Sequence, residues 1–261
     1  MYYRKSRGIF DPNSKEPFQI SRSKIELFLQ CPRCFYMECR LGLGRPSTPP
    51  YTLNNAVDAL LKSEFDLLRK NGEKHELVKK YGLDAIPFQH KDLAQWRGEV
   101  TAYVGALVLD EKSNLMINGL VDDLWQDSEG NVVVVDYKAT STTKEISLND
   151  EYKQSYKRQI EVYQWIFRKL GFPVSKVGYF VFANALKNLP KFDGRLEFEM
   201  SIIPYEGNPD WVDLTLLEIK ELLKADNIPA PSPECEYCAY KQKSVQIAKS
   251  LKEKPLSLFS S

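Results

Sequence analysis

The stretch GLVDDLWQDSEGNVVVVDYKAT, residues Gly119–Thr140, decides the fold. Ser-Glu-Gly at positions 128–130 predicts a three-residue hairpin loop with Gly130 in the left-handed conformation. The four valines after the loop predict a strand in the protein interior, yet that strand ends in Asp136, Tyr137 and Lys138. Isolated buried charges are so costly that they are normally paired or bound to a metal, so this strand end is a candidate functional site.

The predicted loop sets the register of the hairpin. If Asp127 pairs with Asn131, counting outward places Asp122 opposite Asp136. Directly opposed residues have Cβ atoms roughly 4.5–5.5 Å apart, close enough for two carboxylates to share one cation. Because side chains alternate along a strand, Lys138 projects to the same face as Asp136. Two carboxylates and an amine on one face suit metal-dependent phosphodiester hydrolysis, although a solvated ion pair at a strand end is the alternative.

The remaining pattern predicts an α/β layer arrangement with a mixed sheet. Alternation of period two predicts three successive antiparallel strands at residues 99–110, 114–126 and 131–140. Helices are predicted at Leu53–Arg69, Leu148–Leu170 and Asp210–Lys224, and further strands at Val174–Ala183 and Leu196–Ile203. We expect a polar leader at residues 1–20, a single domain at 21–245 and a polar tail at 246–261.

Composition is that of a soluble globular protein. Of the 261 residues, 43% are hydrophobic and 27% are charged, and no apolar run approaches the roughly 20 residues that span a bilayer. The N-terminus lacks the apolar core of a signal peptide, which favours a cytoplasmic location and no membrane association. The net charge of +1 excludes a bulk polycation, so any nucleic-acid binding must be local. Candidate phosphate contacts, which also fit a solvated helix face, are Lys144, Lys153, Lys157, Arg158, Arg168 and Lys169.

Three short motifs occur in a fixed order: GLVD ends one predicted strand, VVDYK ends the next, and QIEVY lies on the following helix. This order resembles the RecB-type branch of the PD-(D/E)XK nuclease superfamily. The resemblance implies a restriction-endonuclease-like core, in which a central mixed β-sheet is flanked by helices. It assigns Asp122 and Asp136 as metal ligands, Lys138 as the catalytic lysine, and Gln159 and Tyr163 as the helix motif of a site that binds Mg²⁺ or Mn²⁺.

The sequence departs from this resemblance on an early helix. Many relatives carry a metal-binding histidine there, whereas this chain places Asp58 at the corresponding position, with Glu64 as a weaker candidate. An aspartate oxygen suits Mg²⁺ or Mn²⁺ at least as well as an imidazole. Exposed charges on an amphipathic helix are the alternative for both residues. The two histidines, His75 and His90, match no motif.

The five cysteines lie near the two ends of the chain, and four of them form two CxxC pairs. These are Cys31 with Cys34 and Cys235 with Cys238. Four thiolates suit a four-iron four-sulfur cluster or tetrahedral zinc, and buried free thiols are the alternative. The pattern resembles iron-sulfur nucleases of the same branch, but Ser244 occupies the position of a third rear cysteine. A metal at this site would join the two chain ends.

The leading hypothesis is a Mg²⁺- or Mn²⁺-dependent deoxyribonuclease. By family analogy it is an exonuclease on single-stranded DNA or free DNA ends in repair, recombination or CRISPR adaptation, with a helicase or CRISPR adaptation protein as partner. The alternative is a catalytically silent nucleic-acid-binding or scaffold protein with a nuclease-like fold. Cleavage of labelled DNA in the presence of Mn²⁺ distinguishes the two.

Overall fold

A computed structural model of the chain describes residues 8–101, 104–150 and 153–252. Its main sheet has five strands in the order β2-β5-β6-β7-β8, and its small sheet has three in the order β1-β4-β3. The main sheet is mixed, because β6 and β7 run parallel while its other neighbours are antiparallel. The strands are β1 (Phe18–Ser21), β2 (Ala85–Pro87), β3 (Ala106–Asp110), β4 (Leu115–Gly119), β5 (Asp123–Asp127), β6 (Val132–Thr140), β7 (Val177–Ala185) and β8 (Phe198–Glu206).

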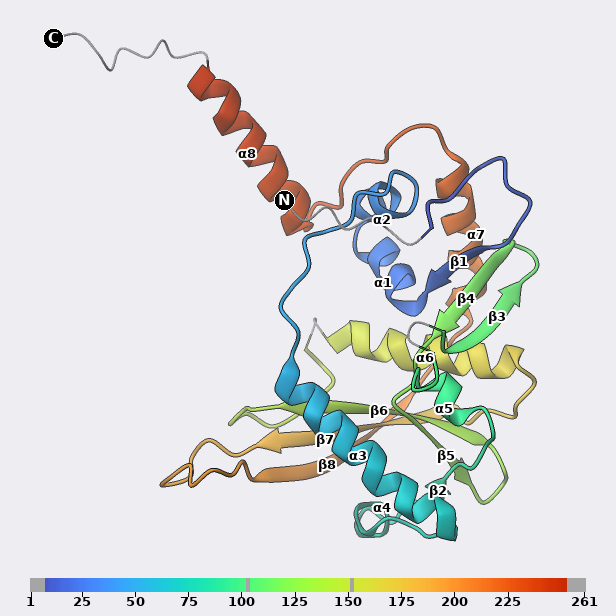
Figure 1. Cartoon of the computed structure of the whole chain (residues 1–261), viewed down its shortest axis with the longest axis vertical. Helices are drawn as coiled ribbons and strands as arrows, with labels where there is room; N and C mark the ends of the chain where they lie inside the picture. The colour runs from blue at the N-terminus through green and yellow to red at the C-terminus, as the bar shows by residue number, and fades with distance from the viewer. Residues whose placement is uncertain (1–7, 102–103, 151–152, 253–261) are drawn as a thin grey trace, which may run out of the picture.

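Helices cover both faces of the main sheet (Figure 1). Helix α3 packs on one face, and α6 lies between the other face and the small sheet. Helices α1, α2 and α7 pack together beside the small sheet, whereas α8 projects away from the body. The helices are α1 (Arg22–Gln30), α2 (Pro32–Cys39), α3 (Thr52–Asn71), α4 (Glu76–Lys80), α5 (Leu93–Trp96), α6 (Gln154–Lys169), α7 (Trp211–Lys224) and α8 (Glu236–Lys252). The predicted mixed sheet flanked by helices is confirmed.

The hairpin of β5 and β6 has the predicted loop and register. Gly130 has a φ of 84°, and the backbone N–H of Asp127 donates to the carbonyl of Asn131 over 3.1 Å. Asp123 is registered against Val135, so the same count places the preceding residue, Asp122, across from Asp136. The conformation of the loop therefore sets the register, and the register places Asp122 and Asp136 across from each other.

The consecutive valines of β6 are apolar because both faces of this strand are covered. Val132 and Val134 belong to the core beneath α6, together with Ile160. Val133 and Val135 belong to the core beneath α3. A strand buried on both faces has no polar side, which explains why alternation stops at the valines. The same alternation then places Asp136 and Lys138 on the α6 side of the sheet.

The expected meander of three strands is wrong, because residues 120–122 leave the ladder. Strands β4 and β5 lie in different sheets, and the backbone between them bonds to other elements. The N–H of Val121 donates to the carbonyl of Trp96 over 3.1 Å, and the hydroxyl of Tyr163 donates to the carbonyl of Leu120 over 2.5 Å. The packing of α6 also requires Gly119, since a Cβ there would lie 2.6 Å from the Tyr163 ring.

The chain ends contribute more secondary structure than their composition suggested. Strand β1 begins inside the expected leader and pairs in parallel with β4, and Phe10 is buried in the core. Helix α8 extends into the expected tail as far as Lys252. Residues 1–7, 102–103, 151–152 and 253–261, which include parts of the expected leader, first strand, long helix and tail, lie outside the described residues. Within the described residues, no helix is long and apolar enough to cross a membrane.

Candidate active site and cysteine site

The acidic site begins with Asp136, whose side chain is fully buried in the middle of β6. Its carboxylate contacts the ammonium group of Lys138. Neither carboxylate oxygen of Asp136 has a hydrogen-bond partner of ordinary geometry among the described residues. A buried carboxylate without such partners is costly, so the site has unused capacity for a cation.

Asp122 reaches the same place from the crossover between β4 and β5. Its Oδ2 accepts a hydrogen bond from the backbone N–H of Tyr137 over 2.9 Å. Burial, together with the negative charge of Asp136, raises the pKa of Asp122 to about 6. Burial disfavours the charged form of Lys138, but the carboxylates of Asp136 and Asp122 outweigh burial and raise its pKa. The two carboxylates and the ammonium group therefore lie together on the α6 side, as the hairpin register predicted.

Asp58, on α3, lies near this group. Its Oδ2 accepts a 2.8 Å hydrogen bond from Lys62, whereas its buried Oδ1 has no partner in the part of the chain that the structure describes. Burial and the charge of Asp122 raise the pKa of Asp58. Glu64, the weaker candidate, instead pairs with His75 over 2.9 Å on the exposed side of α3.

The chemistry of the donors fits a hard divalent cation. Asp122, Asp136 and Asp58 offer carboxylate oxygens, which Mg²⁺ and Mn²⁺ prefer to softer ligands. Two of these oxygens, Oδ1 of Asp136 and Oδ1 of Asp58, have no hydrogen-bond partner within the described residues, whereas Oδ2 of Asp136 contacts Lys138. A bound cation would satisfy them and relieve the repulsion between the carboxylates. Lys138, whose Nζ also lies 4.7 Å from the centre of the Tyr156 ring, is the cationic group beside them.

The helix-motif residues Gln159 and Tyr163 are buried on the sheet-facing side of α6. Gln159 Nε2 donates to the Tyr163 hydroxyl over 3.4 Å, and that hydroxyl donates to the carbonyl of Leu120. Leu120 lies two residues before Asp122, so the motif residues hold the crossover segment that delivers this aspartate. The structure brings Gln159 and Tyr163 to the edge of the site rather than into direct contact with either carboxylate.

A second acidic residue, Asp123, is fully buried on the α3 side of the sheet, and the sequence analysis gave it no role. Its Oδ1 accepts hydrogen bonds from Arg69 over 2.6 Å and from Arg97 over 2.5 Å. Its Oδ2 accepts one from the Tyr137 hydroxyl over 2.8 Å. Strand alternation sends adjacent aspartates to opposite faces, and that rule was sufficient to predict that Asp123 needs its own partners.

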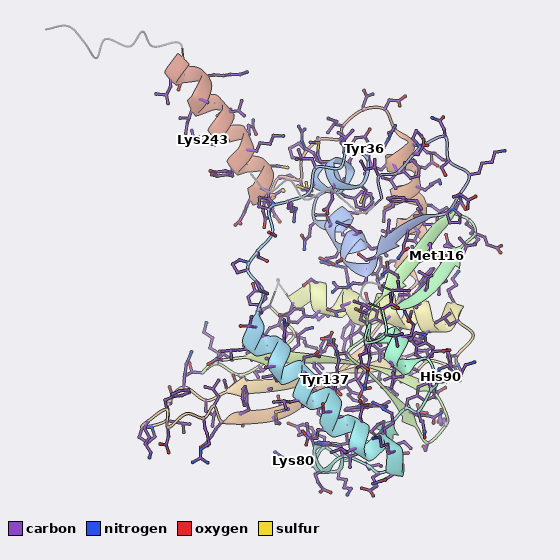
Figure 2. All side chains as sticks on the ribbon, in the orientation of Figure 1. Tyr36, Lys80, His90, Met116, Tyr137 and Lys243 are labelled. Carbon is purple, nitrogen blue, oxygen red and sulfur yellow. The ribbon has the colours of Figure 1, made fainter. Side chains whose placement is uncertain are left out.

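Tyr137 connects the two acidic groups. Its backbone N–H donates to Asp122, while its side chain turns to the other face and donates to Asp123. The ring packs under α3, with its centroid 5.8 Å from that of Phe65, and Figure 2 labels its position beside this helix. The Asp123 network thereby fixes the backbone that supports the acidic site.

The four cysteines of the two CxxC pairs converge. Their Sγ atoms all lie within 4.8 Å of one another, with Cys34 3.6 Å from both Cys235 and Cys238, and Cys31 3.9 Å from Cys238. Burial opposes ionisation, but backbone hydrogen bonds lower the pKa of Cys31 to about 6. This group of thiols has the donors for a metal, and it joins α2 near the front of the chain to the start of α8.

The fifth cysteine does not belong to this group. Cys39 is buried in the core, and burial raises the pKa of its thiol to about 12. Arg45 supports the cysteine site instead, because its Nη2 lies 3.6 Å from the Sγ of Cys235. The expectation that the thiols of the two chain ends meet is confirmed as geometry.

Three of the six candidate phosphate contacts form ion pairs. Arg158 pairs with Glu26, Lys169 with Asp213 and Lys153 with Asp150, at distances of 2.7–3.1 Å. These three side chains stabilise packing around α6 rather than forming a free basic surface.

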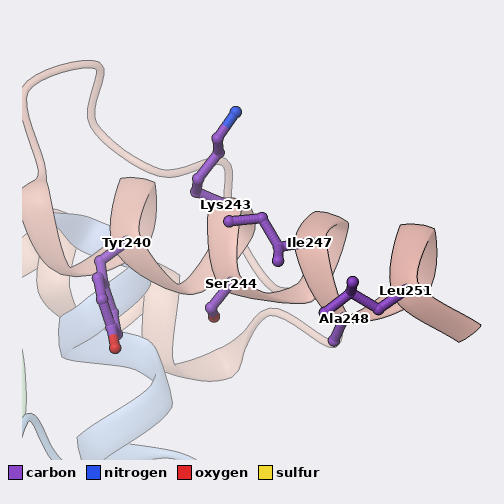
Figure 3. Close-up of a pocket in the computed structure, with 6 residues that line it drawn as sticks. All are labelled: Tyr240, Lys243, Ser244, Ile247, Ala248 and Leu251. Atoms are coloured by element: carbon purple, nitrogen blue, oxygen red, sulfur yellow. The ribbon is translucent and has the colours of Figure 1, made fainter. Parts of the chain in front are cut away.

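A shallow depression on the surface is formed by α8 alone, so it is no enclosed ligand site (Figure 3). It is lined by Tyr240, Lys243, Ser244, Ile247, Ala248 and Leu251.

A model of the PD-(D/E)XK nuclease superfamily matches residues 19–242. No curated protein matches the chain. A solved structure described as "Crystal structure of SSO0001" is 17% identical, with a TM-score of 0.44, and the match covers 88% of this chain and 87% of that one.

Proposed function

The chain belongs to the PD-(D/E)XK nuclease superfamily, and on that premise we propose that it is a Mg²⁺- or Mn²⁺-dependent deoxyribonuclease. One observation carries the proposal: Asp122, Asp136 and Lys138 converge on one face of the sheet beside the middle of β6, where Oδ1 of Asp136 has no hydrogen-bond partner among the described residues. Membership of the superfamily implies nuclease activity on DNA; the choice of these residues rests on their geometry.

In this proposal Asp122, Asp136 and Asp58 hold the divalent cation through their carboxylate oxygens. When bound, the cation polarises the scissile phosphate and lowers the pKa of a water ligand. Lys138 positions the attacking water and stabilises the negative charge that develops as the new phosphorus–oxygen bond forms and the bond to the departing sugar oxygen breaks. Gln159 and Tyr163 fix the segment that carries Asp122.

We extend the proposal to exonuclease action on single-stranded DNA or free ends, in repair, recombination or CRISPR adaptation. The support is the resemblance of the motif order and of the paired cysteines to nucleases of the RecB-type branch. The same resemblance supports a helicase or CRISPR adaptation protein as partner. Residues 21–245 are proposed as one nuclease domain, since the matched segment extends from 19 to 242.

For the cysteine site we propose one metal centre held by Cys31, Cys34, Cys235 and Cys238. A tetrahedral ion with Zn–S bonds of 2.3 Å separates its sulfur atoms by about 3.8 Å. Three of the six sulfur–sulfur separations are 3.6–3.9 Å and all six are at most 4.8 Å, so the four thiols are spaced for one tetrahedral ion, which favours zinc over an iron-sulfur cluster. Metal analysis and the visible spectrum of anaerobically purified protein test this: zinc in a colourless protein supports it, and a brown protein with iron and sulfide contradicts it.

Cleavage of end-labelled single-stranded DNA in Mn²⁺ tests the nuclease proposal. Wild-type protein should cut the DNA, and Lys138→Ala should lower the rate at least about 100-fold because it removes stabilisation of the developing charge. Lys220→Ala is the matched control, since this half-buried lysine of α7 lies outside the acidic site and packs on the ring of Phe10. No cleavage with any divalent cation, or equal cleavage by Lys138→Ala, contradicts the proposal and favours the non-catalytic alternative.

A further inference from the structure

The loop that joins β7 to β8, residues 186–197, is exposed along its whole length. Strand β7 runs parallel to β6, with Phe182 registered against Lys138, so the loop extends from the end of the sheet that bears the acidic site (Figure 1). Its base is attached to the segment after β6, because the Ser141 hydroxyl donates to the carbonyl of Ala185 over 3.0 Å. We call residues 186–197 the hairpin arm.

The tip of the hairpin arm is an ordered turn. Asp193 and Gly194 have positive φ values of 50° and 71°, and the N–H of Arg195 donates to the carbonyl of Phe192 over 3.0 Å. Two central residues with positive φ form the type I′ turn that suits a β-hairpin, and Asp-Gly is a preferred sequence for it. Phe192 and Arg195 are therefore held on either side of a defined turn.

The tip presents one aromatic ring between two cations. Phe192 is 68% exposed, and it is the only exposed phenylalanine in the described part of the chain. Lys191 and Arg195 flank it, with side chains 74% and 81% exposed, and they lie 3.2 and 3.8 Å from the carboxylate of Asp193. Such exposed pairs contribute little free energy, so both cations can exchange this carboxylate for a phosphate. Exposed Leu189 and Leu196 extend the apolar surface. Aromatic rings among cations are typical of surfaces for single-stranded nucleic acid, because rings stack on bases while cations neutralise phosphates.

We propose that the hairpin arm binds single-stranded DNA, with Phe192 stacking on an unpaired base and Lys191 and Arg195 contacting the adjacent phosphates. The inference rests on the proposed nuclease function and deepens it, since it assigns a substrate surface outside the acidic site. We favour DNA over a protein partner because the arm extends from β7, which pairs with the strand that carries Lys138, so that one bound strand would contact both the acidic site and the tip.

The reach of the arm sets the length of strand that it engages. Ten residues separate Phe182 from Phe192, so the tip lies at most about 35 Å from the residue beside Lys138. Nucleotides in a duplex strand are spaced by 3.4 Å, so this distance corresponds to about ten nucleotides at that spacing. An oligothymidylate of about 16 nucleotides, the upper range for one such binding surface, covers both sites.

The experiment measures equilibrium binding of fluorescein-labelled oligothymidylate of about 16 nucleotides by fluorescence anisotropy, without reference to cleavage. Each variant is made in the Lys138→Ala background so that the DNA stays intact. Phe192→Ala should weaken binding roughly 5- to 150-fold, and Phe192→Trp should retain it, because one stacked base is lost or kept. Arg195→Gln should reduce the slope of log K against log salt by about 0.7.

Leu214→Ala, at a 62% exposed position on α7, is the control for loss of exposed apolar area and should bind like the parent. A matched duplex should be bound by Phe192→Ala as it is by the parent, since paired bases are not available for stacking. Unchanged single-strand binding by Phe192→Ala, or an equal loss on the duplex, overturns the proposal and points to a protein-docking role. Because binding is measured, these outcomes are independent of whether the wild-type protein cleaves DNA.

Discussion

Asp122 and Asp123 are neighbours in sequence, yet the sheet places them in opposite chemical situations. On the α3 side, Asp123 is surrounded by Arg69, Arg97 and the Tyr137 hydroxyl. On the α6 side, Asp122 and Asp136 share one ammonium group, that of Lys138, and Oδ1 of Asp136 has no hydrogen-bond partner in the described structure. The first side is a completed salt-bridge network that stabilises the fold. The α6 side has an excess of negative charge, which is the property of a site that binds a cation.

Removing the charge on the completed side should have the largest effect on stability. Asp123→Asn leaves two buried guanidinium groups with only the half-exposed carboxylate of Asp66, and breaking such a network costs about 3–5 kcal/mol. Urea unfolding of the metal-free protein measures this change. Asp226→Asn, at an exposed position just after α7, is the control for the same change of charge, and an equal loss in both variants would remove the special role given to Asp123.

On the α6 side we expect a large loss of activity and only a small loss of stability. Asp136→Asn should lower DNA cleavage at least about 100-fold, because a ligand of the catalytic cation is lost. The free energy of unfolding without metal should fall by no more than about 1 kcal/mol, since a poorly compensated buried carboxylate is removed. Activity assays and unfolding curves on the same preparation check both parts. A large loss of stability without metal would show that Asp136 is a structural residue like Asp123.

Tyr137 joins the two sides, so its hydroxyl offers a finer test. Tyr137→Phe removes one hydrogen bond to a buried carboxylate and should lower the free energy of unfolding by about 1–3 kcal/mol. Cleavage by the folded variant should fall less than in Asp136→Asn, because the backbone N–H that holds Asp122 remains. Thermal unfolding and cleavage rates measured on one sample separate the effects. Wild-type stability in this variant would contradict the network.

The smallest expected effect is a dependence of stability on pH. The pKa of Asp122 is raised above that of an unfolded aspartate, to about 6, so the folded metal-free protein binds this proton more tightly. Its contribution to stability is present below the unfolded pKa and is lost as pH rises through about 6. The melting temperature of Asp122→Asn should therefore fall less between pH 5 and 7. Saturating Mg²⁺ should also diminish the difference.

The hairpin register could be predicted from sequence because its determinants are local. Gly130 and the alternation around it determine the loop, and the loop determines which residues face each other. The break at residues 120–122 could not be predicted, because the period of two continues through it. The residues responsible, Tyr163 and Trp96, are distant in sequence and bond to the crossover backbone only after α6 and the small sheet assemble.

The chain ends show the same division. Two CxxC pairs predicted that the thiols of both ends would meet, because metal-binding cysteines combine regardless of separation in sequence. Strand β1 was not predicted, because it is short and pairs with β4, which lies about one hundred residues later in the sequence. Helix α8 was not predicted, because its residues are exposed and mostly polar and show no clear helical spacing of apolar side chains. The partners of Asp123 and of Arg158 could be identified only in the folded structure, since buried ion pairs join elements that are distant in sequence.

Calorimetric titration of the metal-free protein with Mn²⁺ tests most directly whether the carboxylates of Asp122, Asp136 and Asp58 bind a divalent cation. Wild-type protein and the control Asp84→Asn, whose side chain is exposed, should bind the ion alike. Asp136→Asn should bind at least about tenfold more weakly while remaining folded. Equal Mn²⁺ affinity in all three proteins would contradict the assignment of this site.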